Sequence, residues 1–242
     1  DNPPFARWFE GGQTNLCHNA VDRHLKERSD QAALIAISTE TGTEKTYTFS
    51  DLHREVQRMA ASLQSLGVQK GDRVLIYMPM VADAAFAMLA CARIGAIHCV
   101  VFGGFASGSL ASRIDDATPK VIVSADGGSR GGKPMPYKPL LDEAIRLATH
   151  KPDAVLLTDR QLAPMDLVAG RDYLWSALRQ QHIDTQVPCE PMNSTDISYT
   201  IYTSGTTGKP KGVQRDTAGY TVALAASMKY IFDGRAGETF FS

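Results

Sequence analysis

The chain has 242 residues, of which 43% are hydrophobic and 21% are charged, a composition typical of a soluble globular protein. A formal net charge of −1, without a block of Lys or Arg, argues against a nucleic-acid partner. The longest apolar stretch, residues 84–102, is interrupted by Arg93 and His98, and residues 1–4 lack the features of a signal peptide, so we expect a cytoplasmic protein with no membrane partner.

The first third of the chain predicts a few local elements. Asn19 to Arg28 is expected to form a short helix, and residues 47–49 are expected to end a strand. Apolar residues then recur at helical spacing from Leu52 to Leu66. Ser50 is the expected N-cap of this helix, and Gly67 is its expected C-terminal stop.

From residue 73 onward, apolar strand-like runs alternate with helical segments. The expected strands cover residues 73–78, 97–102, 120–124, 154–158, 196–202 and 212–215. The expected helices cover residues 81–94, 107–116, 139–148, 172–181 and 218–232. Near-continuous apolar strands separated by helices predict an α/β fold, with a mainly parallel sheet layered with helices.

Residues 238–242 have the pattern of a further strand, which would break off with Phe240 and Phe241 unpaired. A natural domain seldom leaves such apolar residues at a terminus. This pattern predicts that the chain is part of a longer protein.

The four cysteines, Cys17, Cys91, Cys99 and Cys189, include no CxxC pair, and none is close in sequence to a His at zinc-site spacing. A disulfide framework is typical of small secreted chains rather than of this composition. We expect reduced, mostly buried thiols and no structural metal.

The most informative motif is Tyr-Thr-Ser-Gly-Thr-Thr-Gly-Lys-Pro-Lys-Gly at residues 202–212, which we call the signature loop. Hydroxyls and glycine amides donate hydrogen bonds, lysines supply positive charge, and glycine lets amides turn toward an anion without a Cβ clash. This combination predicts a polyphosphate ligand.

Two other interpretations of this loop fit less well. A Walker A loop requires four residues between its first Gly and Gly-Lys, followed by Ser or Thr, whereas Gly205 precedes Gly208 by three positions and Pro210 follows Lys209. A flexible Gly/Ser/Thr linker would lie in a compositionally biased region, whereas this loop lies between two apolar strand-like segments.

Two further glycine-rich segments follow predicted strands. Phe102-Gly103-Gly104-Phe105 would let a backbone or a ligand approach closely, although a plain strand-to-helix turn with two core aromatic residues also fits. Residues 127–134 carry Arg130 and Lys133 separated by two glycines. At the carboxyl end of a strand these cations suit a phosphate group, and the alternative is a solvated surface loop.

Taken together, these motifs resemble the adenylate-forming acyl-CoA synthetases. The resemblance covers essentially the whole chain, from residues 4–9 and 19–24 through residues 102–105 to the signature loop. Its pattern is similar to that of the short-chain branch that activates acetate or propionate. Residues 212–216 favour the propionate–CoA ligases within that branch.

This resemblance implies the roles of the site residues. The ATP phosphates would be held by Thr203, Ser204, Gly205, Thr206, Thr207, Gly208 and Lys209. Coenzyme A would be held by Phe102, Gly103, Gly104, Arg130, Gly131, Gly132 and Lys133. The family usually has Arg-x-Gly-Arg at the second segment, so Lys133 keeps the charge of the last arginine but loses its bidentate geometry. No residue of the chain is assigned to acid–base catalysis or to metal binding.

The resemblance also implies the reaction. A short carboxylic acid, propionate or acetate, would react with magnesium ATP to give an acyl-adenylate and pyrophosphate, and the acyl group would pass to coenzyme A with release of AMP. Residues 1–242 would be the N-terminal portion of the large domain, without the C-terminal lid domain and without the magnesium ligands. Such a portion is expected to be inactive by itself.

Two rival functions remain open. A carrier-protein adenylation domain would share the signature loop, but it would not require a coenzyme A phosphate site at Arg130 and Lys133. A non-catalytic nucleotide-binding module would require that the chain be complete as it stands.

Overall fold

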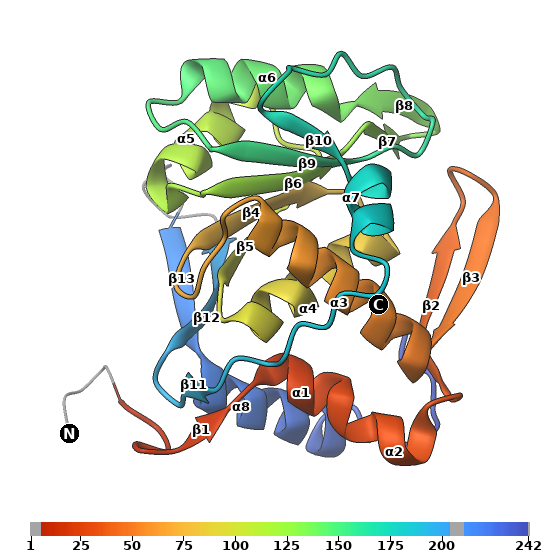
Figure 1. Cartoon of the computed structure of the whole chain (residues 1–242), viewed down its shortest axis with the longest axis vertical. Helices are drawn as coiled ribbons and strands as arrows, with labels where there is room; N and C mark the ends of the chain where they lie inside the picture. Colours follow the sequence, from red (N-terminus) through yellow and green to blue (C-terminus); the bar gives the residue numbers. More distant parts are fainter. Residues whose placement is uncertain (1–5, 204–210, 242) are drawn as a thin grey trace.

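The computed structural model describes residues 6–203 and 211–241. In these residues seven strands form a central sheet in the order β10-β9-β6-β4-β5-β12-β13 (Figure 1). Each neighbouring pair is parallel except β12 and β13, which are antiparallel. In sheet order the strands are β10 (Asp172–Leu174), β9 (Ala154–Thr158), β6 (Val121–Ala125), β4 (Arg73–Met78), β5 (Ile97–Phe102), β12 (Ile197–Thr203) and β13 (Lys211–Asp216).

Helices cover both faces of this sheet. The helices α3 (Phe49–Ser65), α4 (Ala82–Ile94) and α7 (Trp175–Gln181) share one apolar core with the sheet, and α5 (Ser107–Ala117) and α6 (Tyr137–Leu147) share the other. Side chains alternate between the two cores along β4: Val74 and Ile76 face α3 and α4, whereas Leu75 and Tyr77 face α5 and α6. The central strands β4, β6 and β9 are mostly apolar because both of their faces are buried.

The remaining elements lie around this three-layer unit. Two of them, the hairpin of β2 and β3 and the helix α8, extend along its outside (Figure 1). The bounds of all these remaining elements, in chain order, are β1 (Gln13–Thr14), α1 (Leu16–Ala20), a 3₁₀ turn η1 (Asp22–His24), α2 (Leu25–Arg28), β2 (Ala32–Ser38), β3 (Thr43–Thr48), β7 (Gly127–Arg130), β8 (Lys133–Pro136), β11 (Met192–Asn193) and α8 (Thr217–Tyr230).

The structure confirms the expected α/β fold and most of the expected elements. Gly95 ends α4 in the left-handed conformation, with φ of 74°, and Gly67 has φ of 87° just after α3. Asp216 caps α8 by accepting a hydrogen bond from the Tyr220 amide at 3.2 Å. No helix in the described part of the chain is both long enough and apolar enough to cross a membrane.

The expected N-cap of α3 was wrong. Thr48, rather than Ser50, is the N-cap, and its hydroxyl accepts a hydrogen bond from the Asp51 amide while the Asp51 carboxylate accepts one from the Thr48 amide. This reciprocal pair is a capping box, in which an acidic residue three positions later can decide between two nearby hydroxyl residues.

Three other local predictions differ from the structure. Asp172–Leu174 forms an edge strand rather than the first turn of α7, because its backbone pairs with β9. The expected helix from Asn19 to Arg28 is divided among α1, η1 and α2. Residues 238–241 have no regular structure, so the strand expected there does not form in the described residues.

His98 gives the sheet a pH-dependent stability. It lies on β5, buried, with its ring stacked on Tyr199 of β12 at a centroid distance of 5.2 Å, and its Nδ1 has no partner among the described residues. Burial lowers the pKa of His98 to about 4. Between an unfolded pKa near 6.5 and this folded value, the unfolded chain binds more protons than the folded chain, so stability falls as the pH falls.

The free energy of unfolding of the parent protein should fall by about 2 kcal/mol between roughly pH 7 and pH 5. We expect His98→Phe to abolish this decrease. Urea unfolding midpoints at the two pH values measure this difference. His18→Gln, at an exposed position of α1, is the control and should keep the pH dependence of the parent. An unchanged dependence in His98→Phe would contradict this account.

Candidate active site

The segments predicted to bind ATP and coenzyme A begin at the same edge of the sheet. Strands β4, β5 and β12 are parallel neighbours, and Val100 is paired with Ile76 on one side and with Ile201 on the other. Extending this register by two residues places Phe102 level with Thr203 on neighbouring strands. Carboxyl ends of parallel strands form the edge at which open α/β sheets bind ligands.

The segment after β5 depends on close backbone packing. Phe102 is 72% exposed at the sheet edge, whereas Gly103 is buried. A Cβ atom added to Gly103 would lie 2.6 Å from Oη of Tyr137 and 2.9 Å from the Met78 carbonyl oxygen. Gly103 is therefore needed for close packing inside the protein. The segment is a strand-to-helix turn in which a glycine permits the close approach of Tyr137 and of the Met78 backbone.

The second glycine-rich segment is a β-hairpin rather than an irregular loop. Strands β7 and β8 are antiparallel, with residue 130 paired to residue 133. Gly131 and Gly132 form the two-residue turn, with φ of 59° and 76°. Left-handed conformations at both central positions are typical of a type I′ turn, which explains why two glycines separate the two basic residues.

Tyr137, at the start of α6, joins these two segments. A Cβ atom added to Gly128 would lie 2.7 Å from Oη of Tyr137, so this phenol contacts Gly103 on one side and Gly128 on the other. Its ring packs against Tyr77 at 5.1 Å, and Tyr77 Oη donates a hydrogen bond to the Phe105 carbonyl at 3.0 Å. We call Tyr137 and Tyr77 the tyrosine wedge.

Burial raises the pKa of both phenols of the tyrosine wedge, that of Tyr77 to about 12 with a further contribution from Tyr137. Both therefore keep their protons near neutral pH. The wedge is suited to hold the two segments in place rather than to transfer protons.

A buried cation connects β5 to the start of the signature loop. The Arg113 guanidinium of α5 lies over the ring of Phe105, 4.1 Å from its centroid, and 5.5 Å from the ring centroid of Tyr202. Its Nη1 donates a hydrogen bond to the Ser109 carbonyl at 2.7 Å, and burial lowers its pKa. Tyr202, the residue before Thr203, donates a hydrogen bond from its Oη to the Asp116 carboxylate at 2.7 Å.

The predicted site residues are distributed as follows. Phe102, Gly103 and Gly104 follow β5, residues 130–133 form the tip of the β7–β8 hairpin, and Thr203 ends β12 opposite Lys211. The other predicted phosphate-binding residues lie outside the described part of the chain: Ser204, Gly205, Thr206, Thr207, Gly208 and Lys209. Strand β6, which leads into the hairpin, and β12 are three strand spacings apart, roughly 14 Å.

Sequence analysis missed Tyr137 and Arg113. Nothing in the sequence around Tyr137 distinguishes it from other aromatic residues at helix starts. Its importance comes from its contacts with Gly103 and Gly128, which local sequence does not reveal. Arg113 carried a weak signal, because it shares a helix face with Leu110 and Ile114 and a charged residue on an apolar face is unusual. The adjacent carboxylates Asp115 and Asp116 have separate partners, since Asp115 accepts from the His150 amide and Asp116 accepts from Tyr202 Oη.

A hollow of about 450 Å³ lies elsewhere, after β9, and no predicted site residue in the described part of the chain lines it. Its lining comes mainly from the segment 159–167, which holds no cluster of catalytic side chains. The sheet edge after β5 and β12 is the better candidate, because there the backbone pairing and the glycine contacts converge.

Comparison with known proteins identifies the family of the chain. Residues 21–242 match the family model described as AMP-binding enzyme. The chain is 62% identical to a propionate–CoA ligase of Escherichia coli and 64% identical to that of Salmonella typhimurium, in each case over 99% of this chain and 38% of the relative. It is also 45% identical to the human mitochondrial acyl-CoA synthetase short-chain family member 3, over 99% of this chain and 35% of that protein.

The chain therefore belongs to the AMP-binding enzyme family. It spans less than half the length of the relatives it matches, and both of the bacterial relatives bear the name propionate–CoA ligase.

The contact between Tyr137 and Gly103 gives a direct test of the site's packing. We expect Gly103→Ala to destabilise the protein by about 1–3 kcal/mol, because its methyl group would overlap both Tyr137 and the Met78 carbonyl. Urea unfolding measures the loss. Gly108→Ala in α5 is the matched control, with nothing within 4 Å of its added Cβ, and it should be neutral or stabilising. Equal effects of the two substitutions would contradict the contact.

Proposed function

We propose that this chain takes part in the ATP-dependent ligation of a short-chain carboxylate to coenzyme A, with AMP and pyrophosphate as the other products. Propionate is the proposed acid, and acetate is the alternative. The observation that carries the proposal is the shared sheet edge, where the signature loop and the Phe102–Gly104 segment start from adjacent strands. The proposal is supported by sequence identities of 62% and 64% to two propionate–CoA ligases over 99% of this chain.

In the first half-reaction, a carboxylate oxygen attacks the α-phosphorus of ATP, supplied as its magnesium complex. A bond forms between them, and the bond to the β-phosphate oxygen breaks to release pyrophosphate. We assign the grip on the β- and γ-phosphates to Thr203, Ser204, Gly205, Thr206, Thr207, Gly208 and Lys209. Their task is positioning and neutralisation of charge, on which phosphoryl transfer mainly depends.

In the second half-reaction, the thiol of coenzyme A attacks the acyl carbonyl and AMP leaves. We assign coenzyme A binding to Phe102, Gly103 and Gly104 and to the hairpin turn of residues 130–133. The exposed ring of Phe102 offers an apolar surface, and the two basic residues of the turn suit a phosphate group. The tyrosine wedge would set the separation of the two segments.

We further propose that residues 1–242 act as the N-terminal portion of a larger adenylate-forming domain. The chain corresponds to 38% of the bacterial relatives, so the acyl pocket, the adenine and ribose contacts, the magnesium ligands and the lid domain would come from sequence outside the matched region. By themselves, these residues are expected to be inactive. The proposed location is cytoplasmic.

Substitution of Lys209 tests the ATP site. In the protein expressed from the complete reading frame, we expect Lys209→Ala to slow propionate-dependent exchange of pyrophosphate into ATP by roughly 100-fold or more, because losing a charged donor of this kind costs about 2.7–4 kcal/mol. Lys26→Ala, at an exposed position of α2, is the control and should keep the parent rate. Normal exchange in Lys209→Ala would remove the signature loop from the mechanism.

Substitution of Arg130 separates coenzyme A binding from adenylation. Arg130→Ala should raise the KM for coenzyme A by about 10- to 100-fold, as expected for one charge-assisted hydrogen bond, and should leave pyrophosphate exchange unchanged. Arg146→Ala, on the exposed side of α6, serves as the control. If Arg130→Ala impaired both half-reactions equally, or neither, the hairpin would not be the coenzyme A site.

A further inference from the structure

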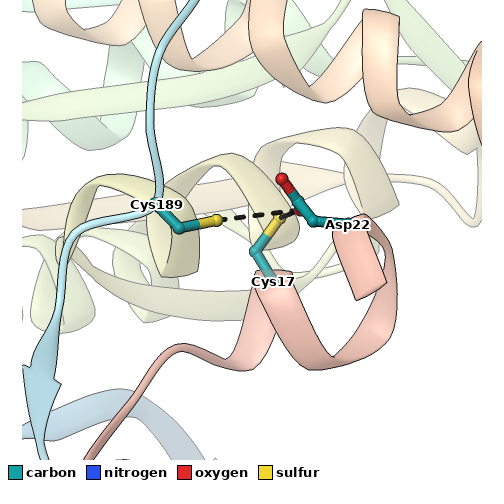
Figure 2. Close-up of side chains that lie close together, drawn as sticks. All are labelled: Cys17, Asp22 and Cys189. Atoms are coloured by element: carbon teal, nitrogen blue, oxygen red, sulfur yellow. Dashed lines mark hydrogen bonds between the residues drawn. The ribbon is translucent and has the colours of Figure 1, made fainter. Parts of the chain in front are cut away.

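Two cysteines that are distant in sequence meet outside the candidate active site. Cys17 belongs to α1, and Cys189 lies in the irregular segment that precedes β11. Figure 2 shows both side chains directed toward Asp22. Each thiol donates a hydrogen bond to the same Asp22 oxygen, at 3.8 Å from Cys17 and 3.7 Å from Cys189. The two sulfurs and this oxygen lie within 4.8 Å of one another.

Arg93 holds this thiol pair in place. Its side chain, 2% exposed, donates to both Asp22 oxygens at 2.9 and 2.7 Å and to the Cys17 sulfur at 3.3 Å. It also fixes the segment around Cys189, because Nε donates to the Val187 carbonyl at 2.5 Å and the Arg93 carbonyl accepts from the Glu190 amide at 2.7 Å. One buried residue thus positions both cysteines.

The same ion pair argues against a metal ion between the sulfurs. A divalent cation bound by the two thiols and Asp22 would lie beside the Arg93 guanidinium and would compete for its only carboxylate partner among the described residues. Leaving a buried cation unpaired is costly. The arrangement is better suited to covalent chemistry between the two sulfurs.

The two thiols differ in access and in acidity. Cys17 is fully buried, whereas Cys189 is partly exposed. Cys17 has one thiol proton, which it can donate either to Asp22 or to Cys189; donation to Cys189, together with the charge of Arg93, lowers the pKa of Cys189 despite burial and the nearby Asp22 carboxylate. Donating that hydrogen bond and being buried raise the pKa of Cys17. Cys189 is therefore the thiol that reacts first, since thiolates are the nucleophilic form.

We propose that Cys189 is a modification site for hydroperoxides and that Cys17 is its resolving thiol. The Cys189 thiolate attacks one peroxide oxygen, the O–O bond breaks, and Cys189 becomes a sulfenic acid while the leaving hydroxide takes up a proton to form water. The Cys17 sulfur then attacks the Cys189 sulfur and expels the second oxygen as water. Two thiols and one hydrogen peroxide thus give one disulfide and two waters.

The geometry allows this bond after a small local movement. The sulfurs start no more than 4.8 Å apart and must approach to about 2.05 Å. The segment 185–191 has no regular structure, so its movement would strain the hydrogen bonds that hold Val187 and Glu190 to Arg93 but would break no helix and no ladder of strand hydrogen bonds. The crosslink would join α1 to the chain that enters β11 and β12.

Peptide mapping of the oxidised protein tests this proposal. The protein expressed from the complete reading frame is treated with hydrogen peroxide in its native state, its free thiols are alkylated, and its peptides are mapped by mass spectrometry without reduction. We expect a peptide linking Cys17 to Cys189 as the main oxidised product, and thiol-reducing agents should reverse it. Cys91 and Cys99 should remain reduced because both are buried.

Single variants test the order of the two steps. In Cys17→Ser, dimedone should trap a sulfenic acid at Cys189, whereas in Cys189→Ser, Cys17 should remain a thiol. Cys99→Ser, at a buried position of β5, is the matched control and should form the same crosslink as the parent protein. The map of the parent protein is decisive even if a variant fails to fold. Unmodified Cys189, oxidation of Cys189 that ends without the crosslink, or a disulfide to another cysteine would overturn the proposal.

Discussion

The backbone pairing of β4, β5 and β12 is the constraint on which the candidate site depends. On β4, Leu75 and Tyr77 face one core while Val74 and Ile76 face the other, so a shift of one residue would move Leu75 and Tyr77 out of their core and into the opposite one. The apolar pattern therefore fixes the register, and the register places Phe102 level with Thr203. Two segments separated by a hundred positions in the sequence thereby become neighbours at one edge, which is where a reaction between two bound substrates requires them.

Packing behind this edge requires Gly103 and Gly128 whether or not a ligand is bound. Gly103 and Gly128 both touch Tyr137, and each would clash with it if it carried a side chain. The φ values of Gly131 and Gly132, in contrast, follow from the tight turn between β7 and β8, where an added Cβ would meet nothing within 4 Å. Neighbouring glycines thus serve different physical purposes: two permit close packing of a phenol ring, and two permit a left-handed turn.

The buried Arg93 organises the opposite end of the molecule. Helix α4 returns from the carboxyl edge of β4 to the amino end of β5, so its last turn lies away from the candidate site. There, Arg93 joins η1 through Asp22, α1 through Cys17 and the segment before β11 through Val187. Removing these charges from water is costly, and the several hydrogen bonds of the guanidinium offset that cost while holding three separate parts of the chain in one arrangement. The thiol pair is a consequence of this arrangement.

The sequence by itself determined the layered α/β fold, every strand of the described central sheet except the edge strand β10, and the three segments that carry the candidate site, because these depend on local periodicity and on short motifs. It also indicated the family. The Thr48 cap of α3 was also encoded locally, by the capping box with Asp51, whereas the tertiary structure decided that Asp172–Leu174 is an edge strand, since its hydrogen-bond partner β9 comes from elsewhere in the chain. The structure also showed that residues 127–136 form a hairpin. It also decided that Tyr137 links two glycine segments and that Cys17 meets Cys189. Such contacts join residues far apart in the chain, and no local pattern encodes which distant partner a side chain will meet.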